Sequence, residues 1–344
     1  MTYGFPFVNN NNYQIEMQKK YEKRQINKKS SGLGFYIFSY FAVMNVTIIA
    51  IMVVLTIFFP KIITNLKISG IPIQLMSMIA SIFAAFIPGL FYFVFSKSDM
   101  SETIKVNRVK LRILIPIVFM GMAVCMIANV AADILNQNFA FFGLENTLDM
   151  DTSSENLAES MFGVVSTALM PAIAEEFAFR GIVLGSLRKY GDTFAIIASA
   201  VMFGAMHGNI VQIPFAFILG LVFGFAVCKT NSLIPAIIIH FINNSYAVIL
   251  SAIQNAKLFD DRTFIMIYFI IVILFCIFGC LAFISVSKKD KDFFTVSDKP
   301  TAFGFSNMLT LKDKLKEFFL NAGVIISIGI FAIETIMYIG IINA

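Results

Sequence analysis

The stretch GFYIFSYFAVMNVTIIAIMVVLTIFF at residues 34–59 decides the fold class, because it contains no Asp, Glu, Lys or Arg. About 20 consecutive apolar residues cross the hydrocarbon core of a bilayer as an α-helix. Residues 71–96 and 232–253 are also free of charged side chains. Core helices of soluble proteins nearly always keep a polar face, so these windows indicate membrane-spanning helices.

The composition of the 344-residue chain supports the same class. Hydrophobic residues make up 58% of the chain, charged residues 14%, and the mean hydropathy is +0.82, whereas soluble domains carry about 25% charged residues. The nine apolar segments are 34–59, 71–96, 111–135, 157–187, 193–208, 213–230, 232–253, 263–287 and 321–342. We therefore predict an all-α, polytopic transmembrane helical bundle of about eight to nine spans.

Two of these segments have unusual lengths. Residues 157–187 would form a helix of about 46 Å, which must tilt, bend or project from the bilayer. Pro171 removes a backbone donor in the middle of this segment and is the expected place for a bend. The segment 193–208 is short, and we expect it to end inside the membrane.

The distribution of basic residues predicts the orientation. With a cytoplasmic N-terminus, 21 of the 26 Lys and Arg residues lie on the cytoplasmic side and 4 on the opposite side. This asymmetry fits the positive-inside rule. No cleavable leader is visible in the first 33 residues, so the first span is expected to direct insertion. Membrane topology also explains the net charge of +5, and we expect no nucleic-acid partner.

Ionisable side chains inside a membrane are costly, and they mark functional sites by default. The only two histidines of the chain and a group of charged residues lie in the fourth, fifth and seventh apolar segments. The candidate site residues are Glu175, Glu176, Arg180, His207, His240 and Asn244. At about 1.5 Å per residue, Glu175 and His207 both lie about 21 Å from the cytoplasmic edge. These depths predict an active site within the membrane.

Spacing gives these residues a geometry. Glu176 and Arg180 are four residues apart, so they share a helix face and can pair. Glu175 is rotated by about 100° and can face another group, and one of the two carboxylates is suited to accept a proton from water. His240 and Asn244 also share a face and can donate jointly to one oxygen, as a developing oxyanion requires. Spacing alone does not choose between Glu175 and Glu176.

Taken singly, each of these features has a structural explanation. A Glu–Arg pair, a membrane histidine or an asparagine often holds helices together. The order of the motifs is more specific: EEFAFRG at 175–181, FGAMH at 203–207 and HFINN at 240–244. Together they resemble the signature motifs of the type II CAAX prenyl endopeptidases and bacteriocin-processing membrane proteases, the CPBP or Abi family. The resemblance covers residues 157–255.

The resemblance implies roles for the candidate residues. Glu175 would be the general base, and His207 would help to position the attacking water. His240 and Asn244 would form the oxyanion hole, while the second carboxylate and its arginine would brace the site or meet the substrate.

The need for a metal is open on the sequence alone. Two histidines and two carboxylates could hold zinc, although the His-Glu-x-x-His helix of many metalloproteases is absent. The family has been described as metal-dependent, while its structural interpretation favours a glutamate-activated water. We expect metal-free catalysis, with zinc on Glu175, His207 and His240 as the alternative.

The predicted function is that of an intramembrane endopeptidase that cleaves a membrane-associated or lipid-anchored peptide by a glutamate-activated water. The alternatives are a catalytically silent binding or immunity protein on the same fold and an ion-coupled transporter. The chain shows no inverted repeat of the kind common in transporters. The expected partners are a peptide or protein substrate and the lipid bilayer, whereas the substrate's identity and the oligomeric state stay open.

The predicted organisation has four parts: a basic cytoplasmic tail (1–33), N-terminal transmembrane helices (34–156), a catalytic core similar to the CPBP family (157–255) and C-terminal transmembrane helices (256–344) with a cytoplasmic stretch at 288–320. The Asn-rich start suggests an irregular tail. Richness in Asn, Ile, Lys and Phe suggests a prokaryotic plasma membrane, and hence peptide or bacteriocin processing more than prenyl-protein maturation.

Overall fold

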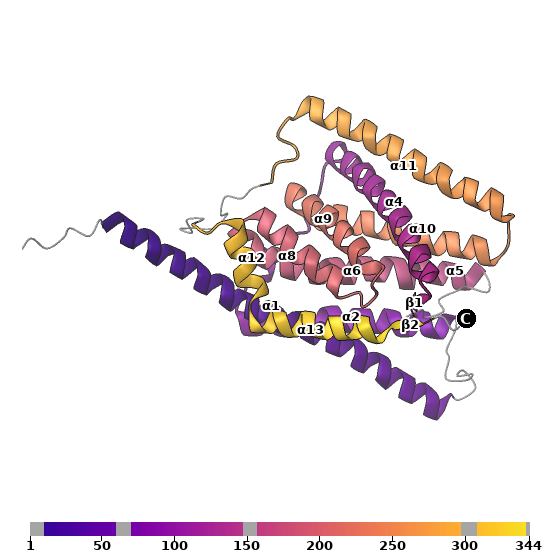
Figure 1. The fold of residues 1–344 in the computed structure, drawn as a ribbon, viewed down its shortest axis with the longest axis horizontal. Helices are drawn as coiled ribbons and strands as arrows, with labels where there is room; N and C mark the ends of the chain where they lie inside the picture. Colours follow the sequence, from indigo (N-terminus) through magenta and orange to yellow (C-terminus); the bar gives the residue numbers. More distant parts are fainter. Residues whose placement is uncertain (1–9, 60–69, 147–156, 297–307, 342–344) are drawn as a thin grey trace, which may run out of the picture.

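The computed structural model describes residues 10–59, 70–146, 157–296 and 308–341. The chain is a bundle of long helices, with α1 and α11 at its edges (Figure 1). Parts of the predicted N-terminal tail (1–33) and of the predicted cytoplasmic stretch 288–320 lie outside the described residues. Within them, the all-α helical bundle is confirmed.

The first half of the chain contains α1 (Asn10–Phe58), α2 (Ile71–Ser96), α3 (Met100–Thr103), α4 (Leu111–Phe141) and the short strand β1 (Leu144–Asn146). The long helix that follows comprises α5 (Leu157–Gly163), η2 (Val164–Leu169), α6 (Met170–Glu175), η3 (Glu176–Leu184), α7 (Gly185–Leu187) and η4 (Arg188–Tyr190). The remaining elements are α8 (Asp192–Ala205), α9 (Gln212–Thr230), α10 (Ile234–Asn255), α11 (Asp261–Lys289), α12 (Leu311–Phe319), α13 (Ala322–Met337) and β2 (Ile339–Ile341).

Seven helices in the described part of the chain are long and apolar enough to cross a membrane, and the chain is an integral membrane protein. An eighth span results if α12 and α13, which are bent by 70° relative to each other, are taken together. The remaining predicted segment, 193–208, corresponds to α8. Helix α8 has 14 residues, whereas about 20 are needed to cross the hydrocarbon core of a bilayer.

The long helix from Leu157 to Tyr190 changes its type along its length. Val164–Leu169 and Glu176–Leu184 are π-helical, and α-helical turns lie between them. Pro171 begins the α-helical stretch directly after the first π-helical one. Because π-helical turns shift the backbone hydrogen bonds by one residue, they accommodate the missing donor of the proline. Residues Glu159–Tyr190 thus form one continuous helix that includes Pro171.

The N-terminal stretch is helical from Asn10, which corrects the expectation of an irregular tail. Residues 13–30 are rich in Lys, Glu and Gln, which favour helices. The helix is also tied to the C-terminal part of the chain. The buried Glu22 carboxylate accepts hydrogen bonds from the backbone N–H groups of Met308 (2.9 Å) and Leu309 (3.1 Å), and lies 3.6 Å from the Lys314 ammonium.

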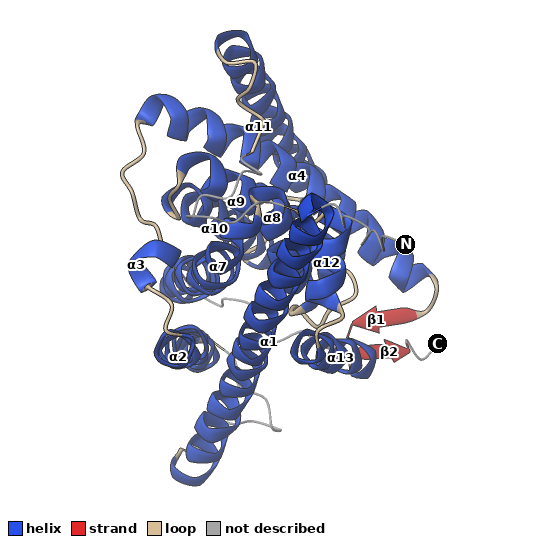
Figure 2. Cartoon of the chain, turned by 90° about the vertical axis from the view of Figure 1, so that its left-hand side faces the viewer, coloured by secondary structure: helices blue, strands red, loops and turns tan. Residues whose placement is uncertain are grey.

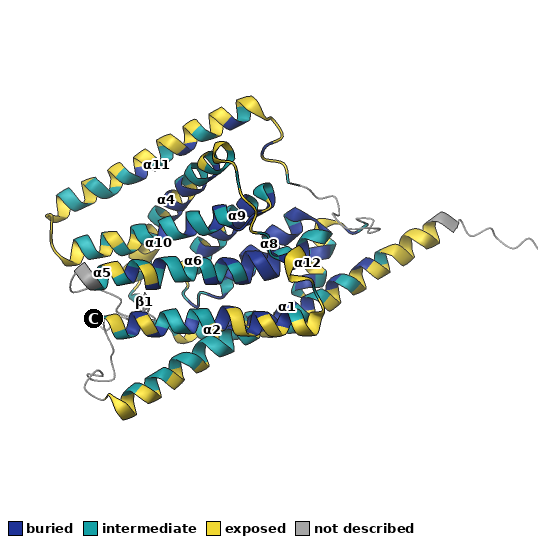
Figure 3. Cartoon of the chain, turned by 180° about the vertical axis from the view of Figure 1, so that it is seen from behind, coloured by how far each residue is buried: buried dark blue, intermediate teal, exposed yellow. Residues whose placement is uncertain are grey.

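Helix α8 lies inside the bundle, where it packs against α9 and the π-helical η3. Figure 2 shows α8 among α9, α10 and α12 when the bundle is viewed from its end. The outer faces of α1, α2 and α11 carry exposed apolar side chains, and these faces are coloured as exposed in Figure 3. An apolar exterior around a buried centre is what a bilayer requires of a helical bundle.

Backbone contacts fix the start of α10 against the loop before α4. The Leu233 N–H donates to the Lys105 carbonyl at 2.8 Å. The Asn107 side chain donates to the Asn231 carbonyl at 2.7 Å, and Ser232 Oγ donates to the Asn107 carbonyl at 2.7 Å. At the other end of α4, β1 pairs antiparallel with β2. The contacts of residues 231–233 with residues 105–107 fix the start of α10, and this helix carries two candidate site residues.

We predict that Gly34→Ala destabilises the bundle. Gly34 of α1 faces the start of α13, and a Cβ there would lie 2.6 Å from the Val324 nitrogen. Because backbone atoms cannot move aside easily, the substitution should cost about 1–3 kcal/mol, measured by thermal unfolding in detergent. Gly329→Ala on α13 is the control, since nothing lies within 4 Å of its Cβ position. Equal melting temperatures for the two variants would contradict the close approach of α1 and α13.

Candidate active site inside the bundle

The structure brings side chains from three segments of the chain together. Glu175 ends α6, and Glu176 begins the π-helical η3 that also carries Arg180. His207 follows directly after the end of α8, and His240 lies on α10 together with Asn244. π-Helical stretches are rare in proteins, and those that occur are often found at functional sites.

Glu176 joins two of these segments. Its carboxylate is fully buried, and Oε1 accepts a hydrogen bond from Arg180 Nη1 at 2.8 Å. The same oxygen lies 3.0 Å from His240 Nδ1 on α10. A carboxylate can only accept in this contact, so Nδ1 carries the proton. The predicted pairing of Glu176 with Arg180 is present, and His240 is an additional partner that the spacing did not predict.

Arg180 is the largest fully buried side chain among the described residues. Its guanidinium carbon lies 4.1 Å from the Phe203 ring centroid and 5.0 Å from that of Phe223. Nε and Nη2 have no hydrogen-bond partner within the described part of the chain. Aromatic faces attract a cation, and this attraction offsets part of the desolvation cost.

The His240 ring is held in a fixed orientation. Phe223 stacks on it with ring centroids 5.1 Å apart and an interplanar angle of 23°. With Nδ1 directed at Glu176, the second ring nitrogen Nε2 points to Glu175, whose Oε2 is 3.9 Å away. His240 therefore lies between the two carboxylates and contacts them through different nitrogens.

Exposure distinguishes the two carboxylates. The Glu175 side chain is 18% exposed, whereas that of Glu176 is 0% exposed. Glu176 is occupied by Arg180 and His240, while Glu175 Oε2 lies 3.9 Å from His240 Nε2. Glu175 is therefore the more accessible of the two carboxylates, and it is the residue that the resemblance names as general base.

Among the described residues, His207 has a hydrogen-bond partner at one of its two ring nitrogens. Its Nδ1 lies 2.8 Å from the Phe203 carbonyl oxygen, which can only accept, so Nδ1 carries the proton. In the neutral ring, Nε2 is then an acceptor. The ring meets Phe203 edge to face with centroids 4.9 Å apart. Phe203 thus contacts both His207 and Arg180, and its packing links the second motif to the first.

Two asparagines that the sequence did not single out support Asn244. Asn129 of α4 donates to Asn243 Oδ1 at 2.9 Å, and Asn243 Nδ2 donates to Asn244 Oδ1 at 3.4 Å. The amide oxygen of Asn244 is therefore an acceptor in this chain, and its Nδ2 remains available as a donor. The adjacent Asn243 and Asn244 were visible in the third motif, but no sequence signal connects Asn129 to them.

Helix α1 also contributes to the site. The buried Tyr40 packs edge to face on Phe179, with centroids 5.9 Å apart, and lies within electrostatic reach of Glu175. Tyr40 lies in an apolar segment that contains one other tyrosine, Tyr36, and its sequence context gives no sign of this contact.

The proposed zinc ligands do not form a metal site as they lie here. Among the described residues, no three His, Cys, Asp or Glu side chains are grouped so that they could hold one metal ion. Glu175 and His240 approach each other, but the set with His207 is not assembled. Metal-free catalysis stays a prediction, and we derive no step through a metal.

Comparison with known proteins finds a family model that matches part of the chain. Residues 157–246 match the family model described as "Type II CAAX prenyl endopeptidase Rce1-like". These residues form an Rce1-like domain. All six candidate site residues lie within it, whereas Asn129 and Tyr40 lie outside.

One curated relative extends the comparison. Over 88 residues the chain is 28% identical to the Bacillus subtilis protein named "Putative membrane peptidase YdiL". The match covers 25% of this chain and 36% of the relative, so it spans about a third of that protein. No solved structure matches the chain. Both the matched family model and this relative carry the name of a peptidase.

We predict that Arg180→Ala lowers the stability of the folded chain. It leaves the buried Glu176 carboxylate without its arginine, and breaking such a pair typically costs about 3–5 kcal/mol. Thermal unfolding in detergent measures the loss. The exposed pair of Lys19 and Glu16 supplies the control, because Lys19→Ala should leave the melting temperature unchanged.

The double variant Glu176→Leu/Arg180→Leu removes both charges together. It should recover stability without full activity, since no buried charge is left unpaired. An Arg180→Ala variant that keeps its melting temperature but loses kcat would show that Arg180 acts in the reaction and does not brace the fold.

Proposed function

We propose that the chain is an intramembrane endopeptidase that cleaves a membrane-associated or lipid-anchored peptide with a water activated by Glu175. The observation that carries the proposal is the different state of two adjacent carboxylates. Glu176 is buried between Arg180 and His240, while Glu175 is partly exposed and has no arginine partner in the described part of the chain. One carboxylate thus supports the site, and the other is accessible to water.

Glu175 would act as general base and then as general acid. It accepts a proton from water as the water oxygen bonds to the carbonyl carbon of the scissile peptide. When the tetrahedral intermediate collapses, the C–N bond breaks, and Glu175 returns the proton to the leaving amine. His207 Nε2, an acceptor because Nδ1 donates to the Phe203 carbonyl, can accept the second O–H of the water and orient it.

His240 and Asn244 would stabilise the oxyanion. With Nδ1–H directed to Glu176, Nε2 can donate to an oxyanion only when the ring carries both protons. Asn244 has its oxygen occupied by Asn243, so its Nδ2 is the group directed to a ligand. Two donors at one oxygen are the arrangement that acyl-transfer sites use.

The metal-free mechanism, the prokaryotic plasma membrane and a role in peptide or bacteriocin processing are further parts of this proposal. The substrate can be sought directly. Cleaved membrane peptides from cells with the wild-type chain are compared with those from cells with Glu175→Gln. A peptide product that depends on Glu175 would identify the substrate class, and identical peptide sets would argue for a silent binding protein.

The proposal also includes a cytoplasmic N-terminus, based on the 21-to-4 distribution of basic residues. The tail and the stretch 288–320 would then face the cytoplasm, and the segment 136–156, which begins in the last turns of α4, would face outward. Single cysteines introduced into these segments are tested in intact cells with an impermeant thiol reagent. The outer loop should react and the tail should not. Labelling of the tail in intact cells would show that the N-terminus faces outward, which contradicts the proposed orientation.

We predict that Glu175→Gln abolishes cleavage in a folded, inserted protein. Gln has the same size and can form hydrogen bonds, but it cannot accept the proton, so kcat should fall by about 10²–10⁴-fold. Steady-state kinetics and thermal unfolding of the purified variant measure both properties. Glu16→Gln, at an exposed position of α1, is the control and should retain full activity. Near-normal activity of the Glu175 variant would exclude it as the base.

We predict that Asn244→Ala lowers kcat much more than it raises KM. The amide contacts strengthen only as charge develops on the oxyanion, and loss of one such donor typically costs about 10²–10³-fold. Asn138→Ala is the control, because Asn138 is exposed and, among the described residues, its side chain donates to the Ile134 carbonyl of its own helix. A variant that mainly loses stability would assign Asn244 to helix packing with Asn243 and Asn129.

A further inference from the structure

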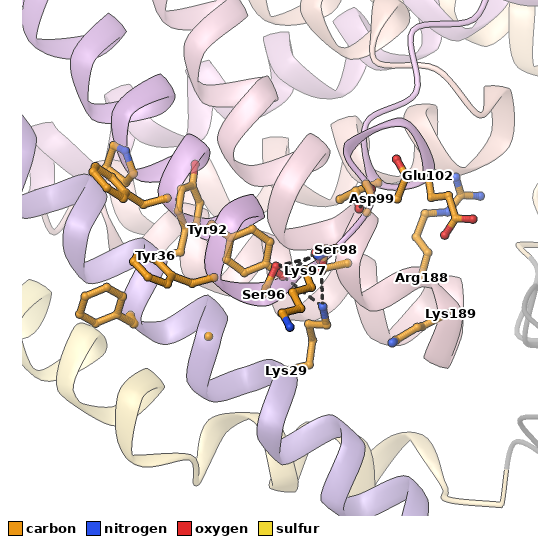
Figure 4. Close-up of a pocket in the computed structure, with 18 of the residues that line it drawn as sticks. Lys29, Tyr36, Tyr92, Ser96, Lys97, Ser98, Asp99, Glu102, Arg188 and Lys189 are labelled. Carbon is orange, nitrogen blue, oxygen red and sulfur yellow. Dashed lines mark hydrogen bonds between the residues drawn. The ribbon is translucent and has the colours of Figure 1, made fainter.

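A large cavity lies apart from the candidate active site. It has a volume of about 1470 Å³ and is lined by α1, α2, α3 and the C-terminal end of the long helix that carries Glu175. Figure 4 shows Lys29 and Tyr36 of α1 on one side and Tyr92 of α2 beside them. None of the six candidate site residues lines this cavity.

The polar end of the cavity carries an excess of positive charge. Its basic side chains are Lys28, Lys29, Lys97, Lys105, Arg188 and Lys189. Its acidic side chains are Asp99 and Glu102. Arg188 is paired with Asp192 at 2.8 Å, and Asp99 caps α3 by accepting from the Ser101 N–H at 2.7 Å. Hydrogen bonds from Ser101 lower the pKa of the Asp99 carboxyl.

Lys29 lies within electrostatic reach of two other lysines of the cavity, Lys28 and Lys189. Lys189 is also within reach of the Glu102 carboxylate, but none of the three lysines forms a salt bridge with a described residue. Figure 4 shows Lys189 pointing toward the side of the cavity where Lys29 lies. Like charges gathered in a cavity create a potential that concentrates anions.

Hydroxyl groups lie beside these cations. Lys29 Nζ donates to Ser98 Oγ at 2.9 Å, a contact drawn in Figure 4, and is 3.4 Å from the Tyr92 hydroxyl. The Tyr92 and Ser186 hydroxyls are 2.9 Å apart. The partners of Lys29 are therefore neutral, and its charge is not neutralised by them. Ammonium and hydroxyl groups together are suited to bind the oxygens of a phosphate.

The other end of the cavity is apolar and open. Phe35 of α1 and Phe91 and Phe95 of α2 line it, with exposures of 66%, 53% and 77%. These rings lie on the outer, apolar faces of two membrane-spanning helices. A free phosphate or a soluble anion would use only the basic end, whereas a ligand with an acyl chain would use both.

We propose that this cavity binds a phospholipid with an anionic headgroup. The phosphate lies among Lys28, Lys29 and Lys189, near the hydroxyls of Ser98 and Tyr92, and the acyl chains run along the exposed phenylalanines. Basic cavities between membrane helices commonly hold such headgroups. The proposal goes beyond the peptidase function and does not depend on it. A bound lipid would connect α1 and α2 with the helix that carries Glu175.

The chain contains no tryptophan, which allows a direct test. In Phe91→Trp, the single tryptophan lines the cavity. In Phe269→Trp, it lies on the exposed face of α11. Each full-length variant is placed in vesicles that contain brominated phosphatidylglycerol or brominated phosphatidylcholine, since bromine quenches tryptophan at short range. The anionic lipid should quench the Phe91→Trp signal at a lower mole fraction than the zwitterionic lipid, and both should quench Phe269→Trp equally.

A triple variant tests the role of the charges. Lys28→Gln/Lys29→Gln/Lys189→Gln in the Phe91→Trp chain should lose the preference, by about fivefold for each cation removed. The matched control is Lys288→Gln/Lys289→Gln/Lys291→Gln, which removes the same charge from exposed positions outside the cavity and should keep the preference. Unchanged quenching of Phe269→Trp in the triple variant shows that the chain is still inserted and folded.

Three results would overturn the proposal. The first is equal quenching by the two lipids at Phe91→Trp in the unmodified background. The second is a preference that survives in the triple variant. The third is displacement of the anionic lipid by a peptide with a free C-terminal carboxylate but not by unbrominated phosphatidylglycerol, which would assign the cavity to a peptide. Loss of peptidase activity in any variant does not bear on these outcomes, because quenching measures occupancy alone.

Discussion

The buried carboxylate of Glu176 holds the candidate site together. One of its oxygens is shared by Arg180 on the same helix and His240 on α10. A charge at this depth would be prohibitively costly without such partners. By occupying Arg180 and the Nδ1 side of His240, Glu176 leaves Glu175 without an arginine and turns the other imidazole nitrogen toward it. The accessibility of Glu175 is thus a consequence of how its neighbour is bound.

Aromatic packing maintains this arrangement. Phe203 contacts both Arg180 and His207, and Phe223 contacts both Arg180 and His240. Two rings therefore connect all three motifs, and they exclude water from the guanidinium while they fix the imidazoles. The short helix α8 matters for the same reason, because it ends at Ala205 and delivers His207 to the interior. If α8 continued as a regular helix, His207 would lie within a helical turn and not beyond the helix end.

The periphery of the bundle restrains the helices that carry the site. Asn129 on α4 reaches the third motif through Asn243, and Tyr40 on α1 lies close to Glu175. The Glu22 carboxylate ties the first helix to the segment before α12. The proposed lipid cavity lies between the same first helix, α2 and the end of the site-bearing helix. The Rce1-like domain is therefore supported by helices from both sides of the sequence.

The sequence by itself determined the class of protein, since charge-free stretches such as 34–59 can be stable only in a bilayer or a buried core. It also determined the six candidate residues, because ionisable groups in apolar segments are few and their spacing places Glu176 beside Arg180. Only the tertiary structure decided which carboxylate is accessible, since this depends on the contact between Glu176 and His240, 64 residues apart. The contacts of Asn129, Tyr40 and Phe223 likewise arise from helix packing, which no local pattern encodes.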